Sequence, residues 1–338
     1  PLIDAPVLTR AAGRFAPQQK GRPPVRYIPV PLFASVMGLG GLALTWRRAA
    51  LVWELPAWPF HVLLAVAGAV FVLVAAGYLG KLIRHPDAVL ADLTHPIRMS
   101  FVPTITISLL ILATGLTEIA PGLASALWWV GAVGHLVATL YVISAWFTRH
   151  DITRDTMTPA WLIPIVGNVV TPLAAPAVGN LELAWFSFGI GVIFWLGLWP
   201  MLLNRVLVHD NPLPAKLTPT IAIFLAPPSV VALSWQSLTG SLADPAGIVL
   251  HATAVFFALL LLTQVPRLMR LPFSLPILAY TFPVATVATV TVAMAGATGS
   301  GFHTALGIIA LVAATGIVLG AVGRVAWAAA QGQIFRPE

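Results

Sequence analysis

Residues 58–82 read WPFHVLLAVAGAVFVLVAAGYLGKL, an apolar run without a single Asp or Glu. A helix of this length extends about 37 Å, which exceeds the roughly 30 Å hydrocarbon core of a bilayer. The mean hydropathy of the chain is +0.92 and only 9% of its residues are charged, which excludes a soluble globular domain. Nine further apolar segments follow the same pattern, at 27–46, 100–118, 124–147, 160–178, 183–203, 217–237, 246–264, 273–295 and 304–327. The sequence therefore predicts an all-α integral membrane protein with ten transmembrane helices.

The basic residues predict the orientation of these helices. Of the 18 Lys and Arg residues, all but Arg47 and Arg48 fall in tails and loops on one side of the predicted spans. Because basic loops stay in the cytoplasm, both termini are predicted to be cytoplasmic. The chain then divides into a basic cytoplasmic tail at 1–26, a transmembrane domain at 27–330 and a cytoplasmic C-terminal tail at 331–338.

The same composition argues against several classes of function. No Asp or Glu lies in the middle of a predicted span, which disfavours cation transport and proton coupling and is compatible with an anion pathway. Cysteine is absent, and the sequence has no glycine-rich phosphate loop, paired carboxylates or metal-ligand spacing. We therefore predict no enzyme activity, no metal, no cofactor and no nucleic-acid partner. An integral-membrane enzyme or a quinone-binding subunit is disfavoured for the same reasons.

Prolines separate the odd-numbered segments from the even-numbered ones. Proline kinks a membrane helix, and the carbonyl groups that it frees are tolerated in the protein interior or beside water. The even-numbered segments carry proline only at their ends or lack it. We expect five helical hairpins, with the odd-numbered helices forming an inner pore and the even-numbered helices outside. The kinks are predicted at Pro31, Pro103, Pro164, Pro227 and Pro283.

Polar side chains follow the same alternation, and together with Gly38 they supply the candidates for the pore wall. The polar candidates are Ser35, Thr104, Ser108, Asn168, Ser229 and Thr286. Gly38 lies in a glycine run that favours close helix packing or a wider pore, and the two interpretations are compatible. Asn168 either lines the pathway or bridges two helices. The basic stretch Lys81–Arg98 either sets topology alone or forms a vestibule that concentrates anions.

Several motifs resemble one known family. Tyr27-Ile28-Pro29-Val30-Pro31 leads into Met37-Gly38-Leu39-Gly40, and His95-Pro96-Ile97-Arg98-Met99-Ser100-Phe101 precedes the third segment. Together with residues 159–164 and 224–227, their order and spacing resemble the tellurite-resistance/dicarboxylate transporter family, over about 27–330. That family includes the bacterial TehA proteins and the plant slow-type guard-cell anion channels.

The resemblance implies a homotrimer in which each subunit has its own pore, plugged by a phenylalanine of the ninth helix. Residues 278–282, LAYTF, match that stretch and assign the plug to Phe282. A second aromatic, Tyr280, lies two residues before it. The expected function is an anion-selective channel or transporter for small monovalent anions such as chloride or nitrate, through an uncharged pore. The resemblance to bacterial proteins implies a location in the inner membrane of a bacterium. The alternatives are a secondary carrier for C4-dicarboxylates such as malate, or a tellurite-resistance exporter.

Overall fold

A computed structural model describes residues 25–178, 180–208 and 212–336. The predicted N-terminal tail at 1–26 therefore lies almost entirely outside the described residues. Within them the chain is helical and has no strand, which confirms the all-α prediction. Among the described residues, nine helices are long and apolar enough to cross a membrane. A shorter apolar helical stretch, Pro159–Leu173, lies at the position of the fifth predicted span.

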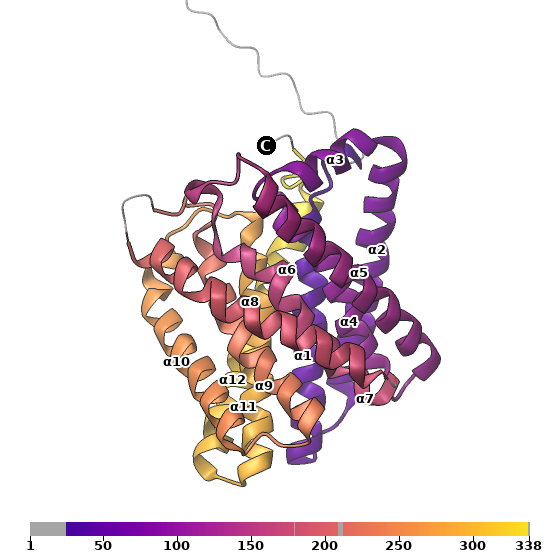
Figure 1. Cartoon of the computed structure of the whole chain (residues 1–338). Coiled ribbons are helices and arrows are strands. Elements are labelled where there is room, and N and C mark those ends of the chain that lie inside the picture. The colour runs from indigo at the N-terminus through magenta and orange to yellow at the C-terminus, as the bar shows by residue number, and fades with distance from the viewer. Residues whose placement is uncertain (1–24, 179, 209–211, 337–338) are drawn as a thin grey trace, which may run out of the picture.

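The long helices run back and forth between two ends of one bundle (Figure 1). We call the end that holds residues 25–27 and 334–336 the terminal end, and the opposite end the far end. Ile28 packs in the same apolar cluster as Ile334 and Phe335, so the two ends of the described chain meet. Five long helices return the chain from the far end to the terminal end: α2 (Trp58–Arg84), α5 (Pro121–Thr148), α8 (Leu181–Leu207), α10 (Pro245–Leu268) and α12 (Gly301–Ala330).

The other five passes each begin with a short 3₁₀ helix near the terminal end and continue as an α-helix. The pairs are η2 (Val30–Leu32) with α1 (Phe33–Trp53), η3 (Arg98–Phe101) with α4 (Thr104–Leu116), η5 (Pro159–Trp161) with α6 (Leu162–Val166), η7 (Thr218–Leu225) with α9 (Ala226–Thr239), and η8 (Leu275–Tyr280) with α11 (Thr281–Thr298). Most of the predicted kink prolines stand at these junctions. The first turn of an α-helix tolerates proline because its N–H groups have no intrahelical acceptor.

The fifth pass differs from the others because it never becomes a long α-helix. After α6 the chain returns to a 3₁₀ helix, η6 (Gly167–Leu173), which contains Pro172, and ends in the short α7 (Ala175–Val178). Smaller elements cap the terminal end: η1 (Val25–Tyr27), α3 (Pro86–Thr94) and η4 (Arg154–Thr156). The described chain therefore makes ten passes, as predicted, but the fifth pass is a broken helix.

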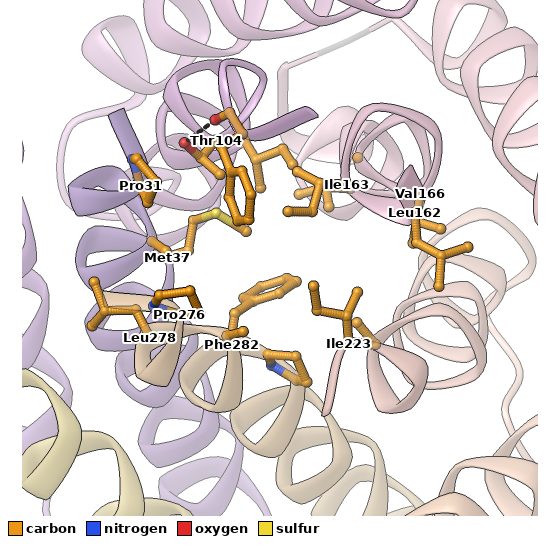
Figure 2. A pocket seen from close by; sticks show the side chains of 18 of the residues that line it. Pro31, Met37, Thr104, Leu162, Ile163, Val166, Ile223, Pro276, Leu278 and Phe282 are labelled. Atoms are coloured by element: carbon orange, nitrogen blue, oxygen red, sulfur yellow. Dashed lines mark hydrogen bonds between the residues drawn. The ribbon is translucent and has the colours of Figure 1, made fainter. Parts of the chain in front are cut away.

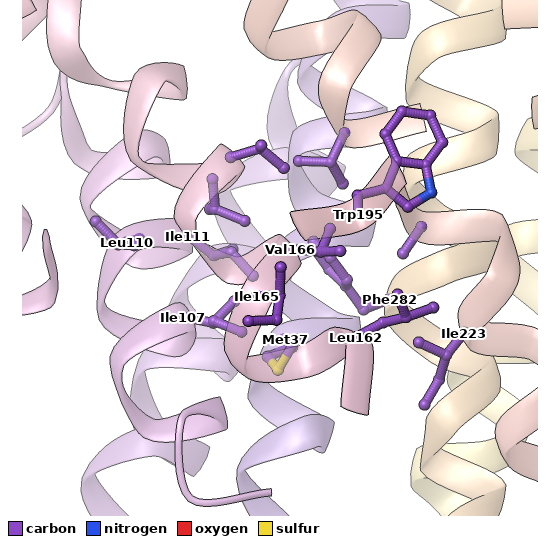
Figure 3. Packing of buried hydrophobic residues seen from close by; sticks show 14 of the residues in the cluster. Met37, Ile107, Leu110, Ile111, Leu162, Ile165, Val166, Trp195, Ile223 and Phe282 are labelled. Atoms are coloured by element: carbon purple, nitrogen blue, oxygen red, sulfur yellow. The ribbon is translucent and has the colours of Figure 1, made fainter. Parts of the chain in front are cut away.

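Burial separates the two sets of passes. In the four long spans that begin with 3₁₀ turns, 67–78% of the apolar window is buried, against 17–33% in the five returning helices. The inner elements contact one another in a closed ring, from α1 to α4, η6, α9, α11 and back to α1. Figure 3 shows part of the core, where Ile107 and Ile111 of α4 lie beside Ile165 and Val166 of α6. The odd-numbered passes are therefore the inner ones, and the even-numbered passes surround them.

Candidate functional site

The ring of inner helices encloses an apolar space, which we call the neck cavity. Its volume is about 60 Å³, enough for only a few water molecules. Its walls are aliphatic side chains, prolines and the rings of Phe101 and Phe282, with Thr104 as the one hydroxyl among the described lining residues. The Thr104 hydroxyl donates to the Phe101 carbonyl at 2.6 Å, so it adds no free donor to the space. No charged side chain lines it in the described part of the chain.

A second, larger space opens toward the far end, and we call it the far cavity. Its volume is about 490 Å³, and Glu118 at its rim has a side chain that is 72% exposed. The wall carries two arginines, Arg47 and Arg48, and a set of polar side chains: Thr114, Thr117, Gln236, Ser237, Thr286 and Thr289. The two cavities thus differ sharply in polarity.

Phe282 stands between the two spaces. Of the described residues, it is the only one that lines both cavities. Figure 2 shows its ring pointing into the middle of the neck cavity, between Met37 of α1 and Ile223 of η7. The residue is only 8% exposed although it borders two cavities, because its neighbours surround the ring. Tyr280 lies in η8 and lines neither cavity.

The other residues proposed from the sequence are distributed unevenly around this site. Pro31, Thr104, Pro227 and Pro283 line the neck cavity, and Thr286 lines the far cavity. A second group lines neither cavity and is buried between helices: Ser35, Gly38, Pro103, Ser108, Pro164, Asn168 and Ser229.

Hydrogen bonds within the bundle explain why most of the second group stays away from the cavities. The hydroxyls of Ser35 and Ser229 donate to Leu32 and Leu225 of the same helical pass, at 2.6 and 2.7 Å. Ser108 donates to its own helix at Thr104 and reaches Phe33 of α1. These hydroxyls satisfy backbone carbonyls in the interior, which removes the cost of burying them unpaired.

Asn168 and Gly38 connect neighbouring helices. The Asn168 amide donates to Thr139 of α5 at 2.8 Å and to the Ile165 carbonyl at 3.0 Å. A Cβ atom at Gly38 would lie 2.4 Å from Thr281, so this glycine allows α1 and α11 to approach closely. In this structure Asn168 bridges two helices and Gly38 allows close helix packing, which are the packing interpretations of these two residues.

The basic residues of the terminal end line neither cavity in the described part of the chain. Lys81 instead forms a buried ion pair with Asp92 at 2.6 Å and donates to the Ile28 carbonyl at 3.0 Å. The Tyr78 hydroxyl donates to the same carboxylate at 3.1 Å. This cluster ties α2 to α3 and to the chain before η2. No group of three or more His, Asp or Glu side chains suited to a metal occurs among the residues described.

The sequence did not predict that Arg47 and Arg48 line the far cavity, because both were used only to assign the orientation of the spans. The spacing of residues along the helix could have predicted it for Arg48. Gly41, Leu44, Arg48 and Leu51 recur every three or four residues, so they share one face of α1. That face lines the far cavity.

Comparison with known proteins identifies the family. The sequence profile of the SLAC1 family, described as voltage-dependent anion channels, matches residues 27–326. This chain belongs to the SLAC1 family. The match covers all ten passes, and the family is one of anion channels, which is not a class of enzymes. The resemblance inferred from the sequence is therefore confirmed.

Two similar proteins come from a plant and a bacterium. The S-type anion channel SLAH3 of Arabidopsis thaliana is 28% identical over 284 residues, covering 82% of this chain and 44% of the plant protein. The tellurite resistance protein TehA homolog of Haemophilus influenzae is 26% identical over 262 residues, covering 77% of this chain and 79% of the bacterial protein. The matched region is thus about half the length of the plant channels SLAH3 and SLAH2, and most of the bacterial protein.

Proposed function

We propose that this protein conducts small monovalent anions, such as chloride or nitrate, along a path through the neck cavity and the far cavity, with Phe282 as the gate. The observation that carries the proposal is that Phe282 borders both cavities. Membership of a family of voltage-dependent anion channels supports the substrate class.

The closed state follows from the polarity of the neck. An anion that enters an apolar space must shed water and finds no donor there to replace it, so the transfer is strongly unfavourable. Narrow apolar constrictions also lose their own water, which blocks ions before steric contact does. The ring of Phe282 makes the space both narrower and drier. Rotation of that ring out of the neck would join the two cavities, which is the opening step of this proposal.

A carrier for C4-dicarboxylates or a tellurite exporter remains the alternative substrate assignment. A dianion such as malate must lose a larger hydration energy than chloride, and a neck of about 60 Å³ without a basic side chain offers little in return. This comparison favours monovalent anions over dicarboxylates.

Assembly and location belong to the same proposal. The outer helices expose large apolar side chains, including Val72 and Leu73 on α2 and Val312 on α12, as expected of surfaces that contact lipid or a second subunit. We propose a homotrimer in a bacterial inner membrane, with one pore per subunit and both termini cytoplasmic. Mass measurement of the detergent-solubilised protein tests the trimer.

Current recording from purified protein in a planar bilayer tests the function. Under a chloride gradient, the reversal potential should follow the chloride equilibrium potential. A reversal potential that follows the potassium gradient would exclude the anion assignment. Electroneutral exchange of malate without current would assign the carrier function instead.

A further inference from the structure

The far cavity holds two adjacent arginines whose environments differ. Arg47 pairs with Glu118 and donates to the Thr114 carbonyl at 3.1 Å, and its guanidinium lies 5.7 Å from the centre of the Phe60 ring. The charge of Arg47 is therefore neutralised and its side chain is held against the wall. An anion in the cavity gains little from Arg47 in this arrangement.

Arg48 lines the same cavity without such a partner. No carboxylate and no hydrogen-bond acceptor pairs with its guanidinium among the residues that the structure describes. Arg47, Arg48 and Glu118 are the charged residues in the described lining, so the cavity keeps one net positive charge. That charge is the one on Arg48.

The position of Arg48 relates it to the gate. Gly41 lies on the same face of α1, and a Cβ atom there would come within 3.2 Å of the Phe282 ring. Arg48 follows Gly41 by seven residues, which places its backbone about 10 Å further along the helix axis, toward the far end. An anion beside Arg48 is therefore held in the wide space directly before the neck.

The hydroxyls of the far cavity do not compete with Arg48 for an anion. Thr114, Thr286 and Thr289 donate to carbonyls of their own helices at 2.8 Å, and Ser237 donates to the Pro172 carbonyl at 2.8 Å. Their hydrogens therefore point into the protein and their lone pairs remain, which repels an anion.

Gln236 is the further polar side chain to consider, because its buried Oε1 atom has no hydrogen-bond partner among the described residues. The NH₂ group of Gln236 donates to no acceptor among the described residues, so it can donate to an anion in the cavity at no loss of an existing bond. An unpartnered amide and an unpartnered guanidinium thus line one water-accessible space.

We propose that the far cavity is a binding site for one monovalent inorganic anion, in which Arg48 supplies the charge and Gln236 a donor. Glu118 limits the net charge of the site to one unit by pairing with Arg47. The inference rests on the proposed function at one point, because we identify the bound anion with the anion that the channel conducts. A single uncompensated charge suits a monovalent anion and lets it leave again, as conduction requires.

Equilibrium binding tests the site without any transport. The full chain in a zwitterionic detergent is titrated with sodium iodide at constant ionic strength, with gluconate as the replaced anion, and the unfolding temperature is recorded. A saturable rise is expected for the wild type and for Arg48→Lys, and a loss of that rise for Arg48→Gln. Glu118→Gln should bind iodide more tightly. Arg84→Gln is the matched control, because Arg84 is exposed at the terminal end, away from both cavities.

The second experiment measures anion current in bilayers. The bilayers are made only of zwitterionic lipid, so that no anionic headgroup can occupy the site. In the Phe282→Ala background at low salt, Arg48→Gln should reduce anion current entering from the far end by about tenfold, because focused charge raises local ion concentration by that order. The difference should shrink near 1 M salt, where screening reaches only about 3 Å.

The binding and transport experiments distinguish a failure of the anion site from a failure of the proposed channel function. If iodide stabilises Arg48→Gln as well as the wild type and the currents are equal, the anion site is wrong. If Phe282→Ala carries no anion current while iodide binding still depends on Arg48, the site stands and the proposed channel function fails.

Discussion

The ring of Phe282 lies against the backbone of Gly41, since a Cβ atom at position 41 would come within 3.2 Å of Phe282 Cδ2. The same Cβ would also lie 3.2 Å from the Cβ of Ala285. The wall of α1 opposite Phe282 therefore has no side chain where the ring packs. Any movement of the ring past α1 uses the space that this glycine leaves.

Gly41→Ala should hold the gate closed. The added methyl group fits only if its neighbours shift by a few tenths of an ångström, so the fold should survive while the ring loses its freedom to turn. We expect anion flux into vesicles to fall several-fold relative to the wild type. The same substitution should have little effect when Phe282 is also replaced by Ala, and an equal loss in both backgrounds would contradict the contact.

Gly38→Ala should destabilise the protein rather than alter its gate. A methyl group there would lie 2.4 Å from Thr281, and such overpacking typically costs about 1–3 kcal/mol. Gly68→Ala on α2 is the matched control, because nothing lies within 4 Å of its added methyl group. Unfolding temperature in detergent should fall for Gly38→Ala and not for Gly68→Ala; equal values would show that α1 and α11 are not in close contact at this point.

Orientation can be tested by labelling, because the chain has no cysteine of its own. Thr153 is exposed at the terminal end and Ala243 is exposed at the far end. The distribution of Lys and Arg predicts that a membrane-impermeant maleimide labels Ala243→Cys on intact cells and spares Thr153→Cys. The opposite pattern would invert the predicted topology.

Selectivity should follow the cost of dehydration. An apolar neck cannot replace the water that an ion loses, so weakly hydrated anions should pass best. The expected order of permeability in the Phe282→Ala variant is nitrate or iodide ahead of chloride, with sulfate and malate far behind. Bi-ionic reversal potentials measure this order directly. Malate ahead of chloride would assign the protein to dicarboxylate transport.

Hydropathy and proline spacing predicted much of the fold for a clear physical reason. Apolar length is required of every membrane span, and proline is tolerated in the interior of a membrane protein, so both patterns reflect the environment of whole segments. The broken fifth pass is harder to foresee. Pro164, Gly167 and Pro172 each weaken an α-helix, but the final mixture of 3₁₀ and α turns depends on packing against α8 and α9.

The candidate site was harder to predict than the fold. Ser35 and Ser229 lie on inner helices as expected, yet both hydroxyls bond to carbonyls of their own helical pass and face no cavity. A polar residue in a membrane helix can satisfy its backbone as well as line a pathway, and sequence alone does not distinguish the two. Arg48 was overlooked because its importance depends on which face of α1 meets the cavity.

The central claim is that Phe282 closes the path between the neck cavity and the far cavity. Single-channel recording of Phe282→Ala in a planar bilayer, beside Tyr280→Ala as the matched control, tests it most directly. Tyr280 is an aromatic two residues away that borders neither cavity. We predict a large rise in anion conductance for Phe282→Ala and little change for Tyr280→Ala. A conducting Tyr280→Ala variant beside a Phe282→Ala variant that is destabilised without conducting would contradict the gate.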